Sequence, residues 1–289
     1  MSDPLGVDPL FEQFLKERIY LRAVSAKTEA WYRNAFKVFQ SSPGDGFSKR
    51  RLQAFVVLLR DRGVKPRTVN TYLQAMNAFG LWLHQEHGYE RVRLPMLRTE
   101  RRVIPTLTED QIRRIVSFSP KAYPWVRLHV LALTVLDTGI RIDEALKLRW
   151  TEVDMDDMLL TVIGKGNRQR KVPCSFELRK RLFRWSQTLQ KRVPGCELVF
   201  PTRGGTVLGQ RNSLRALYLL QGKLGLPKFG WHRLRHTMAT QYLKAGGEVV
   251  RLSKVLGHTQ ISTTMKYEHL LTEDIQAPHQ RLSVLQRIR

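Results

Sequence analysis

Two histidines and two arginines occupy five consecutive positions within residues 229–240, FGWHRLRHTMAT. If this stretch is helical, His232 and Arg235 lie on one face, whereas we expect His236 to point elsewhere. So many N–H donors have two explanations: a solvated face of a basic chain, or side chains that converge on an anion held in a fixed geometry. The rest of the sequence decides between them.

Three other places hold charged or nucleophilic side chains in constrained settings. In TGIRIDEALKLRW, the glycine is expected to end one helix, so that Arg141 lies at the turn and Glu144, three residues on, can fix its guanidinium. Lys165 is predicted at the tip of a β-hairpin, because apolar segments flank GKGNRQ. His258 follows an apolar helix, and Tyr267 lies on the next one.

Each of these places also has an ordinary structural explanation. Arg141 with Glu144 is a common helix ion pair, a lysine between glycines is usually a solvated turn, and a single tyrosine is usually core or surface. We assign His236, Arg233 and Tyr242 to this ordinary class. The chemistry therefore depends on whether the four places come together.

The histidines also raise the question of a metal site. No pair of candidate ligands shows the spacing of a zinc motif, and the two cysteines, Cys174 and Cys196, are far apart in the sequence. The sequence therefore predicts no metal and no other cofactor.

The elements that would position these residues fall into two predicted domains. Four segments before residue 88 repeat apolar residues at spacings of three and four, with breaks rich in Gly, Pro and Ser between them. They predict a helical bundle over residues 1–95. The stretch RVRLPMLRTERRVIPT is polar, basic and interrupted by prolines, and it predicts a linker over 96–105.

The second predicted domain, residues 106–289, is mostly helical with a small β-hairpin. Its first helix is announced by Thr108 as the cap and Gln111 reaching back. Later helices are predicted over 176–190, 211–223, 232–245, 248–257 and 261–269, with a last one from about 273. The fold class is therefore mainly α, in two domains.

Composition indicates the kind of partner. The 289 residues carry 49 Lys and Arg against 25 Asp and Glu, a formal net charge of +24 that points to a polyanion, most often nucleic acid. The longest apolar run, VLALTVL, is too short to span a membrane, and the first ten residues lack the pattern of a secretory signal. We expect a cytoplasmic protein with reduced thiols and no membrane partner.

Taken together, the four places resemble the catalytic domain of the tyrosine recombinases, the family of phage integrases and Xer-like site-specific DNA recombinases. The resemblance rests on TGIRIDEALKLRW, GKGNRQRKVP, HRLRHTMATQYLKAGG and LGHTQISTTMKY, which occur in the family's order and spacing. It covers roughly residues 106–270 closely. The helical first domain is similar to the family's core-binding, SAM-like domain in layout alone.

The resemblance implies roles for seven residues in cutting and rejoining DNA. Arg141 and Arg235 would hold the scissile phosphate, with Glu144 orienting the first of them. Tyr267 would attack the phosphate and leave a 3'-phosphotyrosine and a free 5'-hydroxyl, which needs no ATP and no divalent metal. Three further side chains would complete the site, with His232 and His258 hydrogen-bonding the phosphate, His232 helping to deprotonate the tyrosine, and Lys165 acting as general acid.

The resemblance also implies an assembly on DNA. Both domains would grip a duplex with inverted-repeat core sites, within a homotetramer built from a chain that is monomeric in solution, and strands would be exchanged through a Holliday junction. The C-terminal tail, about residues 271–289, would dock on a neighbouring protomer or fold back on its own domain. The protein would then be nucleoid-associated. Candidate DNA contacts are Arg50, Lys65, Arg67, Arg168 and Arg170.

Two alternatives remain open from the sequence. A type IB topoisomerase has a similar site and relaxes one duplex instead of exchanging strands between two. A DNA-binding accessory protein with a vestigial site is the other, although the set of candidate residues is intact. The sequence does not choose among integrase, transposon resolvase and chromosome-dimer resolvase.

Overall fold

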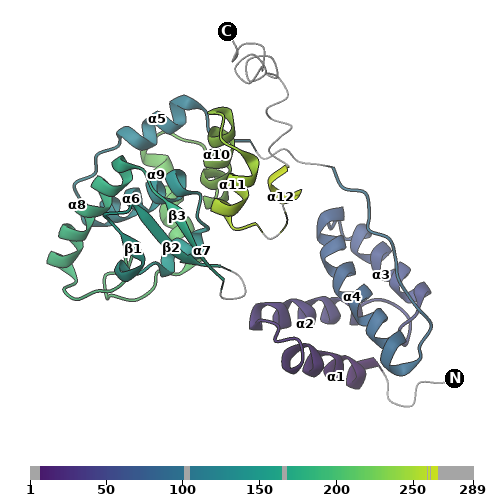
Figure 1. The fold of residues 1–289 in the computed structure, drawn as a ribbon. Helices are drawn as coiled ribbons and strands as arrows, with labels where there is room; N and C mark the ends of the chain where they lie inside the picture. Colours follow the sequence, from purple (N-terminus) through teal and green to yellow (C-terminus); the bar gives the residue numbers. More distant parts are fainter. Residues whose placement is uncertain (1–6, 101–104, 165–167, 259, 261, 266–289) are drawn as a thin grey trace, which may run out of the picture. The chain divides into compact units, whose positions relative to one another are not determined.

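The computed structural model describes residues 7–100, 105–164, 168–258, 260 and 262–265. The chain divides into two units, residues 1–102 and 103–289. Both are mostly helical, and the strands described all lie in the second unit (Figure 1). The predicted fold class, mainly α with a small β element, is confirmed.

The first unit contains four helices in its described residues: α1 (Val7–Tyr20), α2 (Ala26–Gln40), α3 (Lys49–Asp61) and α4 (Pro66–His87). Their ends follow local chemistry, since Ser25 and Ser48 cap α2 and α3 by accepting hydrogen bonds from backbone N–H groups. The helix α4 begins at a proline and ends at Gly88, whose φ of 66° is left-handed. The four predicted helical segments are therefore present.

Aromatic rings hold this unit together. Phe11 stacks on Phe36 with ring centroids 3.8 Å apart and meets Phe79 edge-on at 5.3 Å. Phe14 contacts the same cluster and is fully buried. Each such ring removes a large apolar area from water, so α1, α2 and α4 share one core.

Two asparagines on α4 fix the chain that follows the helix. Asn70 donates to the carbonyl of Leu97 (2.9 Å) and accepts from its N–H (2.8 Å), and Asn77 makes the same pair with Leu94 (2.9 and 3.1 Å). The first residues of the predicted linker, 96–105, therefore still lie against α4. This pairing is non-local, so helical periodicity could not reveal it.

The second unit is built around α6 (Tyr123–Thr138), most of whose residues from Leu128 onward are buried. The other helices described are α5 (Glu109–Ser117), α7 (Ile142–Lys147), α8 (Phe176–Arg192), α9 (Gln210–Lys223), α10 (Trp231–Lys244), α11 (Val249–Leu256) and α12 (Ser262–Met265), with a 3-10 turn, η1, at Trp150–Glu152. The predicted capping box of α5 is present, with Thr108 and Gln111 each bonded to the other's backbone. The predicted helix over 261–269 is described only at α12, and the one from about 273 lies outside the described residues.

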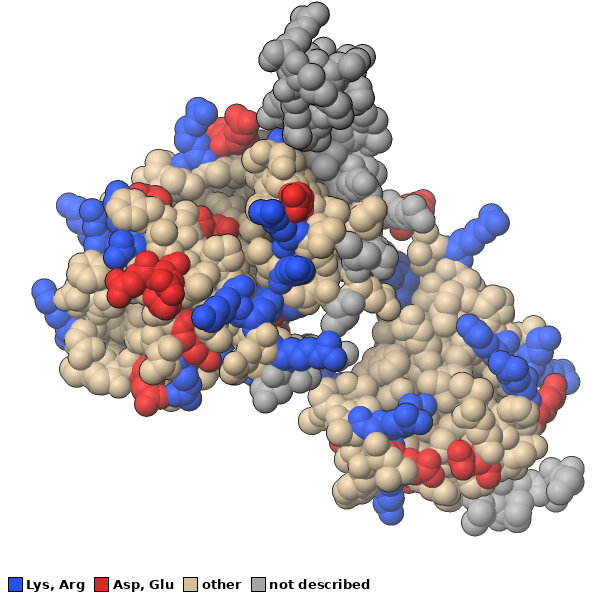
Figure 2. Space-filling model, in the orientation of Figure 1, with Lys and Arg blue, Asp and Glu red and all other residues tan. Residues whose placement is uncertain are grey.

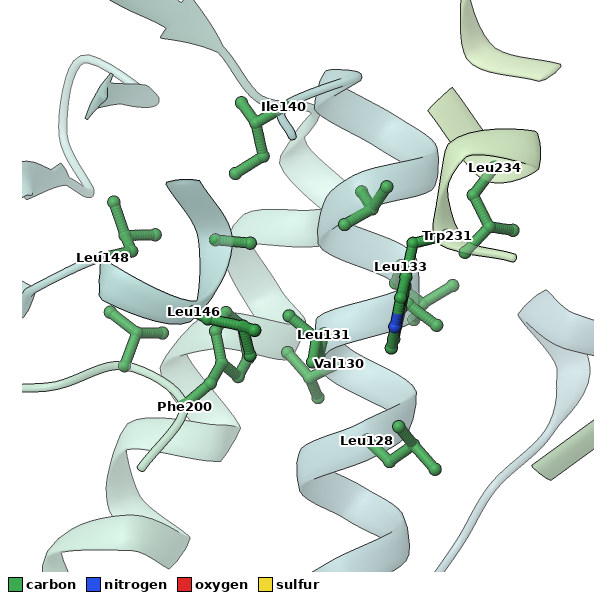
Figure 3. Close-up of a cluster of buried hydrophobic side chains, with 14 of the residues drawn as sticks. Leu128, Val130, Leu131, Leu133, Ile140, Leu146, Leu148, Phe200, Trp231 and Leu234 are labelled. Carbon is green, nitrogen blue, oxygen red and sulfur yellow. The ribbon is translucent and has the colours of Figure 1, made fainter. Parts of the chain in front are cut away.

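Side chains from several elements close around α6. Figure 3 shows Trp231 and Leu234 of α10 on one side of α6, with Leu146 and Phe200 on the other. The helix α8 also packs on α6 and places the fully buried Trp185 in this core. Because α6 ends inside this packing, the turn that follows it is rigidly supported.

The predicted hairpin is present and belongs to a small sheet. Strand β2 (Leu159–Ile163) pairs antiparallel with β3 (Gln169–Pro173), and Val162 lies opposite Arg170. A third strand, β1 (Val153–Asp154), pairs with β2. Two residues are too few to show an alternating pattern, so the sequence did not predict β1.

Candidate active site

Arg141 lies at the turn between α6 and α7, as predicted. Gly139 ends α6 with a left-handed φ of 66°, and a Cβ there would lie 2.9 Å from Leu256 and Met238. The turn therefore requires glycine for two reasons, its backbone conformation and the lack of space for a side chain. The Arg141 N–H donates to Glu144 Oε2 (2.8 Å), and its Nη1 donates to Glu144 Oε1 (3.1 Å). The carboxylate therefore fixes both ends of Arg141, whose side chain remains 42% exposed.

Arg235 is deeply buried in α10, with 2% of its surface exposed. Its Nη1 donates to the carbonyl of Gly139 (2.6 Å), and its Nη2 donates to that of Leu256 (2.8 Å). Both acceptors lie at helix C-terminal ends, where unpaired carbonyls carry partial negative charge. Arg235 thus ties the ends of α6 and α11 to α10.

The two guanidinium groups meet at the end of α11. Arg141 Nη2 lies 3.4 Å from the carbonyl of Gly257, and Arg235 bonds the preceding carbonyl, that of Leu256. Consecutive carbonyls of one helix terminus therefore hold two arginines that are 94 positions apart in the sequence. Two of the predicted phosphate-binding residues are brought together here.

His258 joins the same cluster. Its Nε2 lies 3.1 Å from Arg235 Nη2, and its Nδ1 lies 2.7 Å from the hydroxyl of Thr264. A guanidinium has donors and no acceptor, so Nε2 accepts and Nδ1 carries the proton. Burial and the nearby charges of Arg235 and Arg141 lower the pKa of His258 to about 4, which makes the ring neutral at pH 7.

His232 lies one turn before His236, and the two rings meet edge to face with centroids 4.4 Å apart. The expectation that His236 points elsewhere was wrong, because positions four apart on a helix share a face. Burial, then the charge of Arg235, lowers the pKa of His232, and burial lowers that of His236 to about 4. His232 is therefore held neutral, in the form that accepts a proton.

Arg170 has a different place from the one predicted. Its Nη1 and Nη2 donate to the two oxygens of Glu144 (2.9 and 2.8 Å), and its Nε donates to the carbonyl of Val255 (2.8 Å). The side chain is 14% exposed. This corrects the expectation that Arg170 is a DNA contact, because all three nitrogens of its guanidinium are bonded within the protein.

Glu144 is the shared acceptor of these arginines. Its side chain is 5% exposed, and burial alone would raise the pKa of the carboxyl. The hydrogen bonds from Arg170 and the Arg141 backbone, with the charges of both guanidinium groups, outweigh burial and hold the pKa below its ordinary value. Glu144 is therefore ionised at neutral pH.

Lys165 and Tyr267 lie outside the described residues, although described residues close to both in the sequence lie at the site. Gly164, directly before the lysine, donates its N–H to the carbonyl of Arg168 (2.9 Å), and a Cβ on it would lie 3.7 Å from Glu144. Thr264, three residues before the tyrosine, is fully buried against His258. Sequence reasoning missed Thr264, since nothing in the run ISTTMKY distinguishes it.

The remaining predicted DNA contacts are on the surface. Arg50, Lys65 and Arg67 are exposed in the first unit, and Arg168 is exposed beside the hairpin. Figure 2 shows Lys and Arg side chains over the visible face of each unit, with acidic side chains among them. Within the described parts of the chain, no group of three or more His, Cys, Asp or Glu side chains could hold a metal ion, and both cysteines are free thiols.

Comparison with known proteins identifies the family. A model of the phage integrase family matches residues 105–274, which is more than half of the chain. The chain belongs to the phage integrase family. This tyrosine recombinase is 30% identical to the tyrosine recombinase XerC of Xanthomonas campestris pv. campestris (strain B100) over 275 residues, covering 90% of this chain and 83% of the relative. It is 26% identical to the tyrosine recombinase XerA of Thermococcus kodakarensis, over 100% of this chain and 99% of that one.

Solved structures of the family share the fold of this recombinase. The integrase of the Tn1549 transposon, in complex with transposon right-end DNA, has a TM-score of 0.79 at 18% identity and covers 97% of this chain and 100% of its own. A lambda integrase dimer bound to a core site has a TM-score of 0.72 at 16% identity, covering 91% and 77%. Family membership makes the protein an enzyme of the class that cleaves and religates DNA strands. Among the described helices, none combines the length and apolar character that a bilayer span requires.

Proposed function

We propose that this protein exchanges strands between two DNA core sites by way of a 3'-phosphotyrosine on Tyr267. One observation carries the proposal: Arg141 and Arg235 are bonded to consecutive carbonyls at the end of α11, with His258 beside them. Arg141, Arg170 and Arg235 share one carboxylate, that of Glu144, and this partly buried excess of positive charge is a site for an anion.

The local charge suits a phosphodiester under attack. Three arginines, 141, 170 and 235, and one carboxylate, Glu144, leave two positive charges, since the histidines are neutral. A phosphodiester carries one negative charge and moves toward two in its five-coordinate transition state. Fixed cations therefore stabilise the transition state more than the ground state.

Proton transfers complete the proposed reaction. A phenol has a pKa of about 10, so Tyr267 needs a proton acceptor at neutral pH. His232, whose pKa is lowered by burial and by Arg235, would accept that proton. Lys165 would protonate the 5'-oxygen as it leaves. Because the bond from phosphorus to that oxygen is exchanged for a bond from phosphorus to the tyrosine oxygen, the reverse reaction needs no ATP.

The assembly on DNA is part of the proposal. Arg50, Lys65, Arg67 and Arg168, all exposed, would contact phosphates of a duplex with inverted-repeat core sites. Four protomers would act on two sites through a Holliday junction, with the tail at 271–289 docked on a neighbour. Support comes from the family and from a solved lambda integrase relative that is a dimer on its core site.

Strand exchange is tested on paired sites. Duplexes bound by the protein are first selected from a random inverted-repeat library, and two copies of a selected site are then placed on one supercoiled plasmid. A recombinase yields products with exchanged flanking sequences. A protein that relaxes the plasmid without exchanging flanks is a topoisomerase, and one that binds the sites and does neither is an accessory protein. Either result overturns the proposal.

A further inference from the structure

Arg170 takes no part in the proposed reaction, yet it makes three hydrogen bonds at the site. Arg170 lies on β3 and donates hydrogen bonds to Glu144 in α7 and to the carbonyl of Val255 in α11. The chain makes room for it, since a Cβ on Gly257 would lie 2.9 Å from the Arg170 guanidinium. An arginine that is only 14% exposed and makes three hydrogen bonds within the protein needs a reason beyond surface charge.

The oxygens of Glu144 are divided unequally between two arginines. The planar fork of Arg170 donates one hydrogen bond to each oxygen, at 2.9 and 2.8 Å. Arg141 is left with its backbone N–H on Oε2 and a single longer bond of 3.1 Å from Nη1 to Oε1. Because Arg170 holds both oxygens in this bidentate way, the Arg141 side chain makes one bond to the carboxylate instead of a bidentate pair.

The net charge around Glu144 also depends on Arg170. Arg141, Arg170 and Glu144 carry a net charge of +1, and the more exposed of the two guanidinium groups is Arg141, at 42% against 14%. Without Arg170 the remaining pair would have no net charge, and Arg141 could turn its own fork onto the carboxylate. The surplus charge on the more exposed Arg141 thus depends on Arg170, whose own side chain is only 14% exposed.

We infer that Arg170 is a positioning residue that occupies Glu144 and so keeps the Arg141 guanidinium available for the scissile phosphate. The inference rests on the proposed function, because it assigns Arg141 to that phosphate. Arg170 would thus set both the orientation of the Arg141 guanidinium and the net charge around it. Both effects are tested by restoring the local charge without restoring Arg170.

The test measures the rate of covalent cleavage of a nicked duplex by the full-length protein and its variants. Arg170→Met leaves Arg141 and Glu144 neutral as a pair, and we expect a loss of about 100-fold, the range for one transition-state donor. Glu144→Gln together with Arg170→Met returns the local charge to +1, while the amide oxygen still accepts the Arg141 N–H. We expect this double variant to recover to within about tenfold of the unsubstituted protein.

Controls separate this role from a merely structural one. Lys171→Met removes a neighbouring exposed charge on β3 and should change the rate less than about threefold, the scale of an exposed charge. Arg170→Lys keeps the charge without the fork and should fall between Arg170→Met and the unsubstituted protein. Hydrogen exchange of α7 and α11 in each variant reports whether the site is folded.

The outcomes are distinguishable. If the unsubstituted protein forms no adduct, the proposed function fails, and the inference fails with it. If it does form one, a double variant no faster than Arg170→Met overturns the inference alone. Because neutralising a buried carboxylate that has lost a partner can also restore folding, rescue supports the inference where hydrogen exchange shows Arg170→Met to be folded, and an Arg170→Met protein unfolded at α7 and α11 overturns it. An Arg170→Met protein that cleaves at the normal rate overturns it as well.

Discussion

Replacing Arg235 by lysine should cost both stability and cleavage, although it preserves the charge. The guanidinium reaches two carbonyls and a ring nitrogen at 2.6, 2.8 and 3.1 Å, from a side chain that is almost fully buried. An ammonium donates from a single atom, so it cannot span Gly139 and Leu256 as the planar fork does. At least two charge-assisted bonds are lost, at roughly 1.5 kcal/mol each, or about 3 kcal/mol in all.

Urea denaturation followed by hydrogen exchange of peptides from α6, α10 and α11 measures this loss in the second unit. Covalent cleavage should fall by about 100-fold, the range for one transition-state donor. Arg233→Lys is the matched control, because Arg233 lies on the same helix and its guanidinium makes one bond, to the carbonyl of Thr106 (3.1 Å). We expect this control to lose less than about 1 kcal/mol. An Arg235→Lys protein as stable and as active as Arg233→Lys would refute the reasoning.

Three further predictions concern the surroundings of the site. Thr264→Val removes the acceptor of the His258 Nδ1 proton and should slow cleavage about tenfold, the effect of roughly 1.4 kcal/mol. Thr264→Ser keeps the hydroxyl and should not slow it. Equal cleavage rates for the two variants in single-turnover assays would contradict the assigned tautomer of His258. His236 and His258 have pKa values of about 4 in the folded protein against 6.5, so the unfolded chain binds more protons between these values. The urea midpoint should therefore fall as the pH is lowered from 6.5 to 4, and His236→Gln should flatten that slope; an unchanged slope would contradict the burial argument. Gly257→Ala should lower the melting temperature more than Gly88→Ala does. Both glycines have a left-handed φ (64° and 66°), but only at Gly257 would the new Cβ lie 2.9 Å from a guanidinium. Equal losses of melting temperature would mean that backbone strain alone matters.

Local features of the site followed from the sequence because they depend on spacing. A glycine, an arginine and a glutamate in TGIRIDE determine a helix end, a turn and an ion pair within six positions, and the structure has all three. The hairpin was predictable for the same reason, since its two strands flank their own turn.

Contacts between distant segments could not be predicted. The positive charge of Arg170 favours a contact with DNA, whereas its partners within the protein lie 26 and 85 positions away. The bond from Arg235 to Gly139 spans 96 positions, and the sequence gives no sign of it beyond the shared chemistry of the motifs. His236 follows His232 by four positions, a spacing that places both rings on one helix face, so their contact was predictable from the sequence.

Tyr267 is the proposed nucleophile of a metal-independent reaction. The direct measurement incubates the protein with a nicked duplex in the presence of a chelator, digests the product with protease and determines the mass of the peptide that stays on the DNA. We expect the DNA on the peptide containing Tyr267, no adduct from Tyr267→Phe, and a normal adduct from the control Tyr242→Phe. An adduct that persists in Tyr267→Phe, or a mass that places the DNA on another residue, would contradict the claim.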